Sequence, residues 1–356
     1  MPGFDLRNVR DNFPNLPAKA LEFFHPDNAV RHPKKIVPRT IHEFAIFLQI
    51  PDPENSNRSY MPKWQLLNKI CKILAEYDIL TSYGGGGPHG WDEAYMTNIN
   101  DDNHIIVSPF LDYIVYGFPV IFEDYKKSVL PIVRTDERSD RAIGTAFVHN
   151  GRVLITAAHC IADAKSISIK GVSELDWQRA KVYISKNDAI DLCAIILAED
   201  MPEEIKRLPI RRGDVLDEVI VMGYPNVPGF TDLIAVENAT ISSRIAVTKG
   251  AIASSATEVW AGTELFLITA RVRGGFSGGP VIRERGEVVG VVSRQPLRGV
   301  SENDQMFQNY DGLGYGVAIP SEEISRLLTA VRKCDDTLRT ELNHNAIKYV
   351  EWEEDN

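Results

Sequence analysis

The sequence is most informative at Gly274-Gly275-Phe276-Ser277-Gly278-Gly279-Pro280, where a serine stands among four glycines. A serine hydroxyl is a weak nucleophile at neutral pH. It becomes reactive when a base lies within hydrogen-bond reach and N–H groups face the oxyanion that forms. Glycines let the backbone bend so that successive N–H groups point into one small space. This segment therefore predicts a nucleophile at Ser277, with the N–H groups of Gly275 and Ser277 forming an oxyanion hole.

A histidine that suits the role of base occurs upstream, in Thr156-Ala157-Ala158-His159-Cys160, directly after the apolar run 153–155. The pKa of histidine lies near working pH, so His159 can accept and return a proton. A carboxylate must then hold the correct imidazole tautomer. Asp191, which immediately precedes the apolar residues 192–197, is the expected acid, and Asp188 is the alternative.

These segments resemble the histidine and serine motifs of the trypsin/chymotrypsin-like serine peptidases, and they occur in the same order. Four further segments resemble the HtrA/Deg-like (bacterial trypsin-like) branch of that family: the opening strand Gly144–Val148, the aspartate segment Asp191–Ile196, the turn Gly223–Pro225 and the closing strand Gly314–Pro320. The resemblance covers about residues 126–335.

The resemblance implies a mainly β fold, a chymotrypsin-like double β-barrel of two six-stranded antiparallel barrels with the site between them. It also implies a serine endopeptidase that hydrolyses peptide bonds through an acyl-enzyme, with His159, Asp191 and Ser277 as the catalytic triad. The substrate would be a protein or peptide, and neither a metal ion nor an organic cofactor is expected.

By the same resemblance, three residues line the pocket for the substrate side chain before the cut: Arg271, Ser293 and Gly316. The absence of an acid at residue 271 argues against a preference for Lys or Arg. Arg271 could favour an acidic side chain by charge pairing, or it could point outward into a surface ion pair.

The sequence departs from the family in three places. A cysteine that would pair with Cys160 in secreted trypsins is expected near Ile143-Gly144, and none occurs there. No Ile-Val-Gly-Gly segment follows a basic cleavage point, so activation by a new N-terminus is not expected. No segment long enough for a PDZ domain follows residue 335.

The chain changes character near residue 126, which predicts three regions: a partly helical N-terminal region of unknown function (1–125), the peptidase domain (126–335) and an acidic C-terminal tail (336–356). Helices are expected at 40–49 and 63–80 from their apolar faces, and a closing helix at Ser321–Lys333. Asn150-Gly151 predicts a hairpin. The expected strands are β-branched and bounded by turns: Val129–Arg134, Gly144–Val148, Arg152–Thr156, Lys181–Ser185, Leu192–Leu197, Glu218–Met222, Leu265–Val272 and Glu287–Ser293.

Composition narrows the class of protein. The formal net charge of −10 argues against nucleic-acid binding, which needs a basic surface. No run of 18 apolar residues predicts a membrane span, and no apolar segment near the N-terminus predicts a signal peptide. The four cysteines are dispersed, with neither metal-like spacing nor a disulfide framework. We therefore expect a cytoplasmic protein with reduced thiols.

Other functions fit parts of the pattern. Gly275-Phe276-Ser277-Gly278-Gly279 also matches the Gly-x-Ser-x-Gly elbow of α/β-hydrolases, but that fold requires a helix after the serine and the order Ser, Asp, His. A non-catalytic binding or scaffold protein on the same fold, or an esterase with the same triad, stays open. Residues 1–125 are expected to bind a regulatory partner or substrate.

Overall fold

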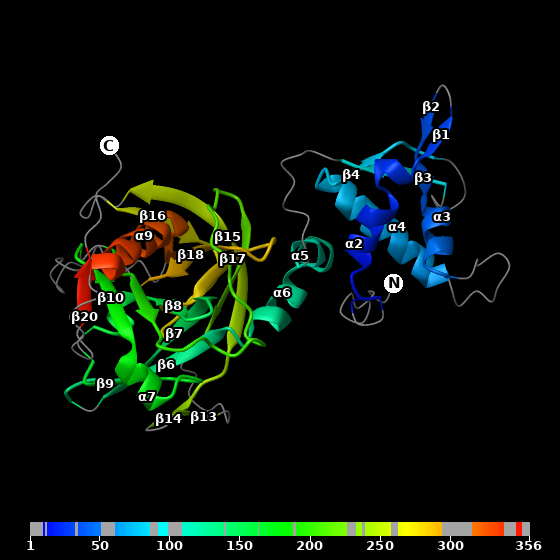
Figure 1. Ribbon diagram of the computed structural model, residues 1–356. Coiled ribbons are helices and arrows are strands. Elements are labelled where there is room, and N and C mark those ends of the chain that lie inside the picture. The colour runs from blue at the N-terminus through cyan, green and yellow to red at the C-terminus, as the bar shows by residue number, and fades with distance from the viewer. Residues whose placement is uncertain are drawn as a thin grey trace. The chain divides into compact units, whose positions relative to one another are not determined.

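The computed structural model forms two compact units, Met1–Val120 and Ile121–Asn356, and each is described by itself (Figure 1). The domain boundaries expected from the sequence stay predictions. The structure describes residues 10, 13–32, 35–50, 61–85, 92–98, 109–138, 140–162, 164–187, 190–225, 233–236, 239–257, 263–293, 315–337 and 347–350.

The first unit is partly helical, with a small antiparallel sheet in the order β3-β5-β4 and a separate β1-β2 pair. Its elements are α2 (Leu16–Phe23), η1 (Pro26–Asn28), β1 (Val30–His32), β2 (Lys35–Val37), β3 (Arg39–Thr40), α3 (Ile41–Phe47), α4 (Met61–Glu76), β4 (Leu80–Ser82), β5 (Ala94–Thr97) and α5 (Phe110–Tyr116); α6 (Phe118–Tyr125) follows.

The two helices expected in this region are confirmed as α3 and α4. The start of α3 is fixed by a capping box, because the Thr40 hydroxyl accepts from the N–H of Glu43 and the Glu43 carboxylate accepts from the N–H of Thr40. The apolar face of α4 places Trp64 and Ile70 in the core, where both are fully buried. None of the helices in the described residues is long and apolar enough to cross a membrane.

The second unit begins with a seven-stranded sheet in the order β20-β10-β11-β8-β7-β6-β9. The strands are β6 (Val129–Thr135), β7 (Arg141–Asn150), β8 (Val153–Thr156), β9 (Ser166–Ile169), β10 (Lys181–Ser185), β11 (Cys193–Ile196) and β20 (Ile347–Val350), with η3 (Ala158–Cys160) and α7 (Glu174–Arg179) between them. β7 and β8 form the hairpin predicted at Asn150-Gly151, and the Asn150 side chain accepts from the N–H groups of Arg152 and Val153.

The remaining long strands close into a barrel in the order β12-β15-β16-β19-β18-β17. They are β12 (Glu218–Gly223), β15 (Ala246–Thr257), β16 (Glu264–Ile268), β17 (Pro280–Arg283), β18 (Val288–Val292) and β19 (Gly316–Pro320), accompanied by the small pair β13 (Leu233–Val236) and β14 (Ala239–Ser242) and by the helix α9 (Ser321–Thr337). Figure 1 shows α9, in orange, beside β18. The helix packs against the barrel strands β18 and β19.

The mainly β fold with a C-terminal helix is confirmed, but the first half differs in detail from the expected six-stranded barrel. β6 pairs with β7 on one side and with β9 on the other, as a barrel requires. In the described residues, however, the outer edge of β10 pairs with β20, in parallel, and not with β9. The helix α7 lies between β9 and β10 in the chain, so the two strands are not joined by a tight hairpin.

Each half of this unit has its own apolar core. In the first sheet, Ile132, Leu154 and Ile195 are fully buried, and in the barrel Val221 and Ile268 are fully buried. Their neighbours along the strands, such as Ile155 and Ile220, are buried as well, so these strands are covered on both faces. Two rigid cores therefore support the segments that leave β8 and precede β17, where the candidate residues lie.

Candidate active site

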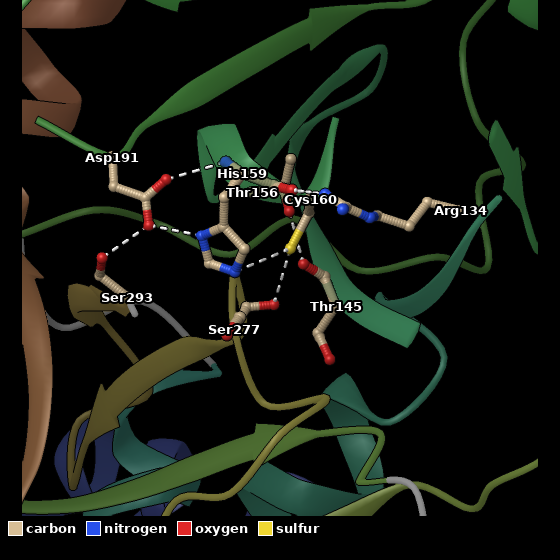
Figure 2. A network of polar contacts seen from close by, with 8 residues as sticks. All are labelled: Arg134, Thr145, Thr156, His159, Cys160, Asp191, Ser277 and Ser293. Atoms are coloured by element: carbon tan, nitrogen blue, oxygen red, sulfur yellow. Dashed lines mark hydrogen bonds and ion pairs between the residues drawn. The ribbon is translucent and has the colours of Figure 1, made fainter. Parts of the chain in front are cut away.

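The structure brings His159 and Asp191 together (Figure 2). His159 lies on η3, the short turn that follows β8. Its Nδ1 donates to Asp191 Oδ2 at 2.7 Å, and its backbone N–H donates to Asp191 Oδ1 at 2.9 Å. Because an ionised carboxylate only accepts hydrogen bonds, this contact places the proton of the neutral ring on Nδ1 and leaves Nε2 free to accept one.

Two further residues hold this pair. The Ser293 hydroxyl, just after β18, donates to Asp191 Oδ2 at 2.7 Å, so three donors converge on one carboxylate. The Arg134 guanidinium, on β6, donates to the carbonyl oxygen of His159. Sequence reasoning missed both contacts, because neither residue lies within a motif. Together they fix the turn and the carboxylate from two separate strands.

The charges of this pair shift both pKa values. Burial by itself lowers the pKa of His159, but the hydrogen bonds and negative charge of Asp191, with a contribution from Cys160, raise it to about 9. Burial raises the pKa of Asp191, but the hydrogen bonds and charge of His159 outweigh burial and lower it. The His159 and Asp191 side chains are only 21% and 15% exposed, so water weakens their attraction little.

Ser277 lies on the Nε2 side of the His159 ring, opposite Asp191 (Figure 2). In the described residues its hydroxyl forms no hydrogen bond with Nε2. The thiol of Cys160 contacts Nε2 at 3.8 Å and donates to the carbonyl oxygen of Ser277 at 3.5 Å. Catalytic hydrogen bonds are often long before substrate binds. A proton transfer from Ser277 to His159 would need this last contact to form in the substrate complex.

Residues 273–279, here termed the nucleophile loop, have the backbone that the glycines predict. Gly275 and Gly278 have φ values of +97° and +81°. A Cβ on Gly275 would lie 2.2 Å from the carbonyl oxygen of Tyr224, and one on Gly278 would lie 2.2 Å from that of Thr145. No other residue type fits these two positions without displacing backbone.

Several N–H groups of the nucleophile loop donate to no described backbone carbonyl, and those of Gly275 and Ser277 are among them. Among the described residues, the N–H groups of Phe276, Gly278 and Gly279 donate to backbone carbonyls, whereas those of Gly275 and Ser277 do not. These two are the N–H groups that the sequence predicts as oxyanion donors. Their availability supports that prediction.

The three residues predicted to line a substrate pocket are only partly brought together. Ser293 and Gly316 lie on neighbouring strand ends, where the N–H of Ser293 donates to the carbonyl of Val317. The Ser293 hydroxyl, however, is bonded to Asp191. A Cβ on Gly316 would lie 2.6 Å from Val272 Cγ2, so an apolar side chain that sequence reasoning missed borders this position. Arg271 is exposed, and no described contact joins it to the other two.

Three further expectations concern the alternative acid, the alternative hydrolase fold and metal binding. Asp188, the alternative acid, lies outside the described residues. The α/β-hydrolase alternative is wrong, because the strand β17 and not a helix follows Ser277. In the described part of the chain, no group of three His, Cys, Asp or Glu residues is placed to hold a metal ion.

The structure shows which position faces Cys160, where secreted trypsins have a second cysteine by the family resemblance. A Cβ on Gly144 would lie 2.5 Å from Cys160 Sγ, so Gly144 occupies the position from which a cysteine could reach this thiol. The described cysteines Cys71, Cys160, Cys193 and Cys334 form no disulfide bond. The first three are buried.

Parts of this chain resemble known proteins. Residues 144–291 match the family model described as the trypsin-like peptidase domain. The protein named "Protease Do-like 2, chloroplastic" from Arabidopsis thaliana is 29% identical over 198 residues, which make up 54% of this chain and 28% of that protein. This chain therefore spans less than a third of that relative's length.

Two solved protease structures match part of this chain. The active form of the Rv3671c protease from M. tuberculosis is 20% identical, with a TM-score of 0.42, and the match covers 59% of this chain and 82% of that one. The HtrA-type protease AlgW, solved with a tripeptide, is 16% identical, with a TM-score of 0.41, and the match covers 59% and 62% of the two chains.

Proposed function

Residues 144–291 match the model of the trypsin-like peptidase domain, and on this premise we propose that the chain is a serine endopeptidase acting through an acyl-enzyme. One arrangement carries the proposal: the Asp191–His159 hydrogen bond, with Ser277 on the opposite side of the ring. Its substrate would be a protein or peptide.

In the proposed reaction, Ser277 Oγ attacks the carbonyl carbon of the scissile bond while its proton passes to His159 Nε2. The carbonyl oxygen becomes an oxyanion that accepts from the N–H groups of Gly275 and Ser277. The C–N bond then breaks, and the leaving amine takes the proton from Nε2. Water, deprotonated by the same nitrogen, hydrolyses the acyl ester and restores Ser277. Asp191 stays ionised and stabilises the imidazolium.

The proposal is tested by mass spectrometry of the protein after reaction with a fluorophosphonate, followed by cleavage of a peptide library. An adduct on Ser277 together with internal cleavage supports the endopeptidase. An adduct with hydrolysis of esters alone supports the esterase alternative. No adduct at all supports a binding or scaffold protein. Enrichment of acidic residues before the cut would support Arg271 as a pocket residue, and an unenriched profile would reject that role.

The raised pKa of His159 predicts an alkaline pH profile. The base must be neutral, so we expect kcat/KM to rise with pH through about 9, above the ordinary value of 6.5. The same shift stabilises the fold: this contribution is fully present below pH 6.5 and is lost as pH rises through about 9. Profiles of kcat/KM and of the melting temperature test this expectation, and a kinetic midpoint at or below 6.5 would contradict it.

We extend the proposal to location and partners. The described cysteines, which form no disulfide bond, and the glycine at the position facing Cys160 support a reducing compartment, which we propose to be the cytoplasm. Recovery of the protein outside the cytoplasm in cell fractionation would reject this. Residues 1–125 are proposed to bind a substrate or regulatory partner, and a chain starting at residue 121 should then differ from the full chain in its response to that partner.

A further inference from the structure

We propose that Thr145 is a positioning residue for the oxyanion hole: its hydroxyl holds the Gly275 peptide of the nucleophile loop in the orientation that catalysis needs. This rests on the proposed function of the loop. Thr145 belongs to β7 of the first sheet, whereas the loop precedes β17 of the barrel. One half of the domain would thus set the geometry of the other.

The contacts of Thr145 centre on the two residues that carry the proposed oxyanion donors. Its hydroxyl donates to the carbonyl oxygen of Gly275 at 2.6 Å, and its backbone N–H donates to that of Ser277 at 2.8 Å. The same hydroxyl accepts from the N–H of Tyr224 at 3.1 Å. Thr145 is fully buried, so water does not compete for these bonds.

The nucleophile loop needs a hydrogen bond that holds it in place, because residues 273–276 can form two types of turn that differ little in energy. The N–H of Phe276 donates to the carbonyl of Arg273 at 3.0 Å and closes a four-residue turn whose third residue, Gly275, has a φ of +97°. A positive φ at this position is the mark of a type II turn. A type I turn closes with the same hydrogen bond, but the peptide between its second and third residues is rotated to the other side.

That peptide joins Gly274 to Gly275 and carries the N–H of Gly275. Glycine adopts either sign of φ at little cost, so sequence alone does not select between the two turns. A hydrogen bond on the Gly275 carbonyl fixes the next peptide plane and thereby restricts rotation about the Gly275 α-carbon. The hydroxyl of Thr145 is the described group that makes this bond.

Replacing Thr145 with valine keeps the shape of the side chain and removes the hydroxyl. The carbonyl of Gly275 and the N–H of Tyr224 would then both be buried without this partner, a costly state that rotation of the loop relieves. We expect kcat to fall about 100-fold with KM little changed, because the loss of one oxyanion donor lowers kcat by about 10²–10³. Thr145→Ser, which keeps the hydroxyl, should retain most of the activity.

Thr156 provides a matched control. Its hydroxyl is equally buried and donates to the carbonyl of Thr145 at 2.7 Å, but it bonds to neither Gly275 nor Tyr224. Thr156→Val should therefore lower the melting temperature as Thr145→Val does while leaving kcat close to that of the unaltered chain. A purely structural role for Thr145 predicts that the two valine variants behave alike.

The test measures kcat, KM and the affinity for a peptide boronic acid in four proteins: the unaltered chain, Thr145→Val, Thr145→Ser and Thr156→Val. The boronic acid is chosen because its adduct with Ser277 places an oxygen in the oxyanion hole. Selective loss of kcat and of boronic-acid affinity in Thr145→Val supports the proposal. Near-normal kcat in that variant, or an equal loss in Thr145→Ser or Thr156→Val, overturns it. If Thr145→Val does not fold, the pair Thr145→Ser and Thr145→Ala decides the question, because they differ only in the hydroxyl.

The outcome is distinguishable from failure of the proposed function. If the unaltered chain neither cleaves peptides nor reacts with a fluorophosphonate, the proposed function fails. A crystal structure of Thr145→Val then decides the positioning role independently of activity. A rotated Gly274–Gly275 peptide supports it, and an unchanged peptide overturns it.

Discussion

Ser277→Ala is expected to abolish the fluorophosphonate adduct and to lower kcat by about 10⁶, the loss typical of removing a serine nucleophile from a triad. The physical reason is that the nucleophile itself is lost: Ser277 is the serine that Figure 2 shows on the Nε2 side of the His159 ring. The change removes a single oxygen from a half-buried loop position, so the melting temperature should hardly change. The measurement is single-turnover cleavage of a peptide found in the library, alongside probe labelling.

The matched control is Ser185→Ala. Ser185 is a buried serine of β10 whose hydroxyl accepts from the N–H of Asn187 and, in the described contacts, bonds to none of His159, Asp191 and Ser277. The Ser185→Ala variant should react with the fluorophosphonate and cleave the peptide at the rates of the unaltered chain. Undiminished labelling of Ser277→Ala would mean that the probe reacts with another residue, and the assignment of the nucleophile would be wrong.

Asp191→Asn is expected to lower kcat by about 10⁴, as the loss of the orienting carboxylate does in this type of triad. Three donors meet at Asp191: the backbone N–H and Nδ1 of His159, and the Ser293 hydroxyl. An asparagine offers one oxygen and an NH₂ group, which itself needs an acceptor. The ring of His159 then places its proton on Nε2, where it can no longer accept the proton of Ser277.

The kinetic measurement is kcat at saturating substrate, and the matched control is Asp188→Asn. This second variant should keep normal kcat, because the described carboxylate that bonds to His159 belongs to Asp191 and not to the alternative acid, Asp188. A loss below tenfold in Asp191→Asn, or a large loss in Asp188→Asn, would show that the acid had been wrongly assigned. The pH profile adds a second readout, because the midpoint of kcat/KM should fall once the carboxylate that raises the pKa of His159 is gone.

Much of the fold was predictable because its strands are short, β-branched and bounded by turns. The strand expected at 181–185 has those bounds as β10, and the helix expected at 321–333 forms as the start of α9. The strand expected at 265–272 ends at Ile268 instead. Apolar residues continue past that point, but the chain there turns toward the nucleophile loop, and apolar character alone does not reveal where pairing stops.

The residues of the candidate active site could be predicted only where they belong to a short sequence motif. His159, Asp191 and Ser277 lie beside glycines or next to apolar strands, which mark them in the sequence. Ser293 was expected in a pocket, yet its hydroxyl bonds to Asp191, 102 residues earlier in the chain. The contact of Thr145 with Gly275 spans 130 residues. The direction of such a hydroxyl is set by tertiary packing, which no local pattern encodes.

The parallel pairing of β20 with β10 has a consequence for biosynthesis. Strand β10 ends at Ser185, but the strand that covers its outer edge begins at Ile347. While the ribosome makes the intervening residues, the emerging chain presents an uncovered strand edge, and such edges pair readily with other chains. Contacts between segments so distant in sequence also form slowly. The interval of greatest risk of aggregation therefore lies during translation, before the last residues emerge, and chaperone demand should fall once β20 has docked.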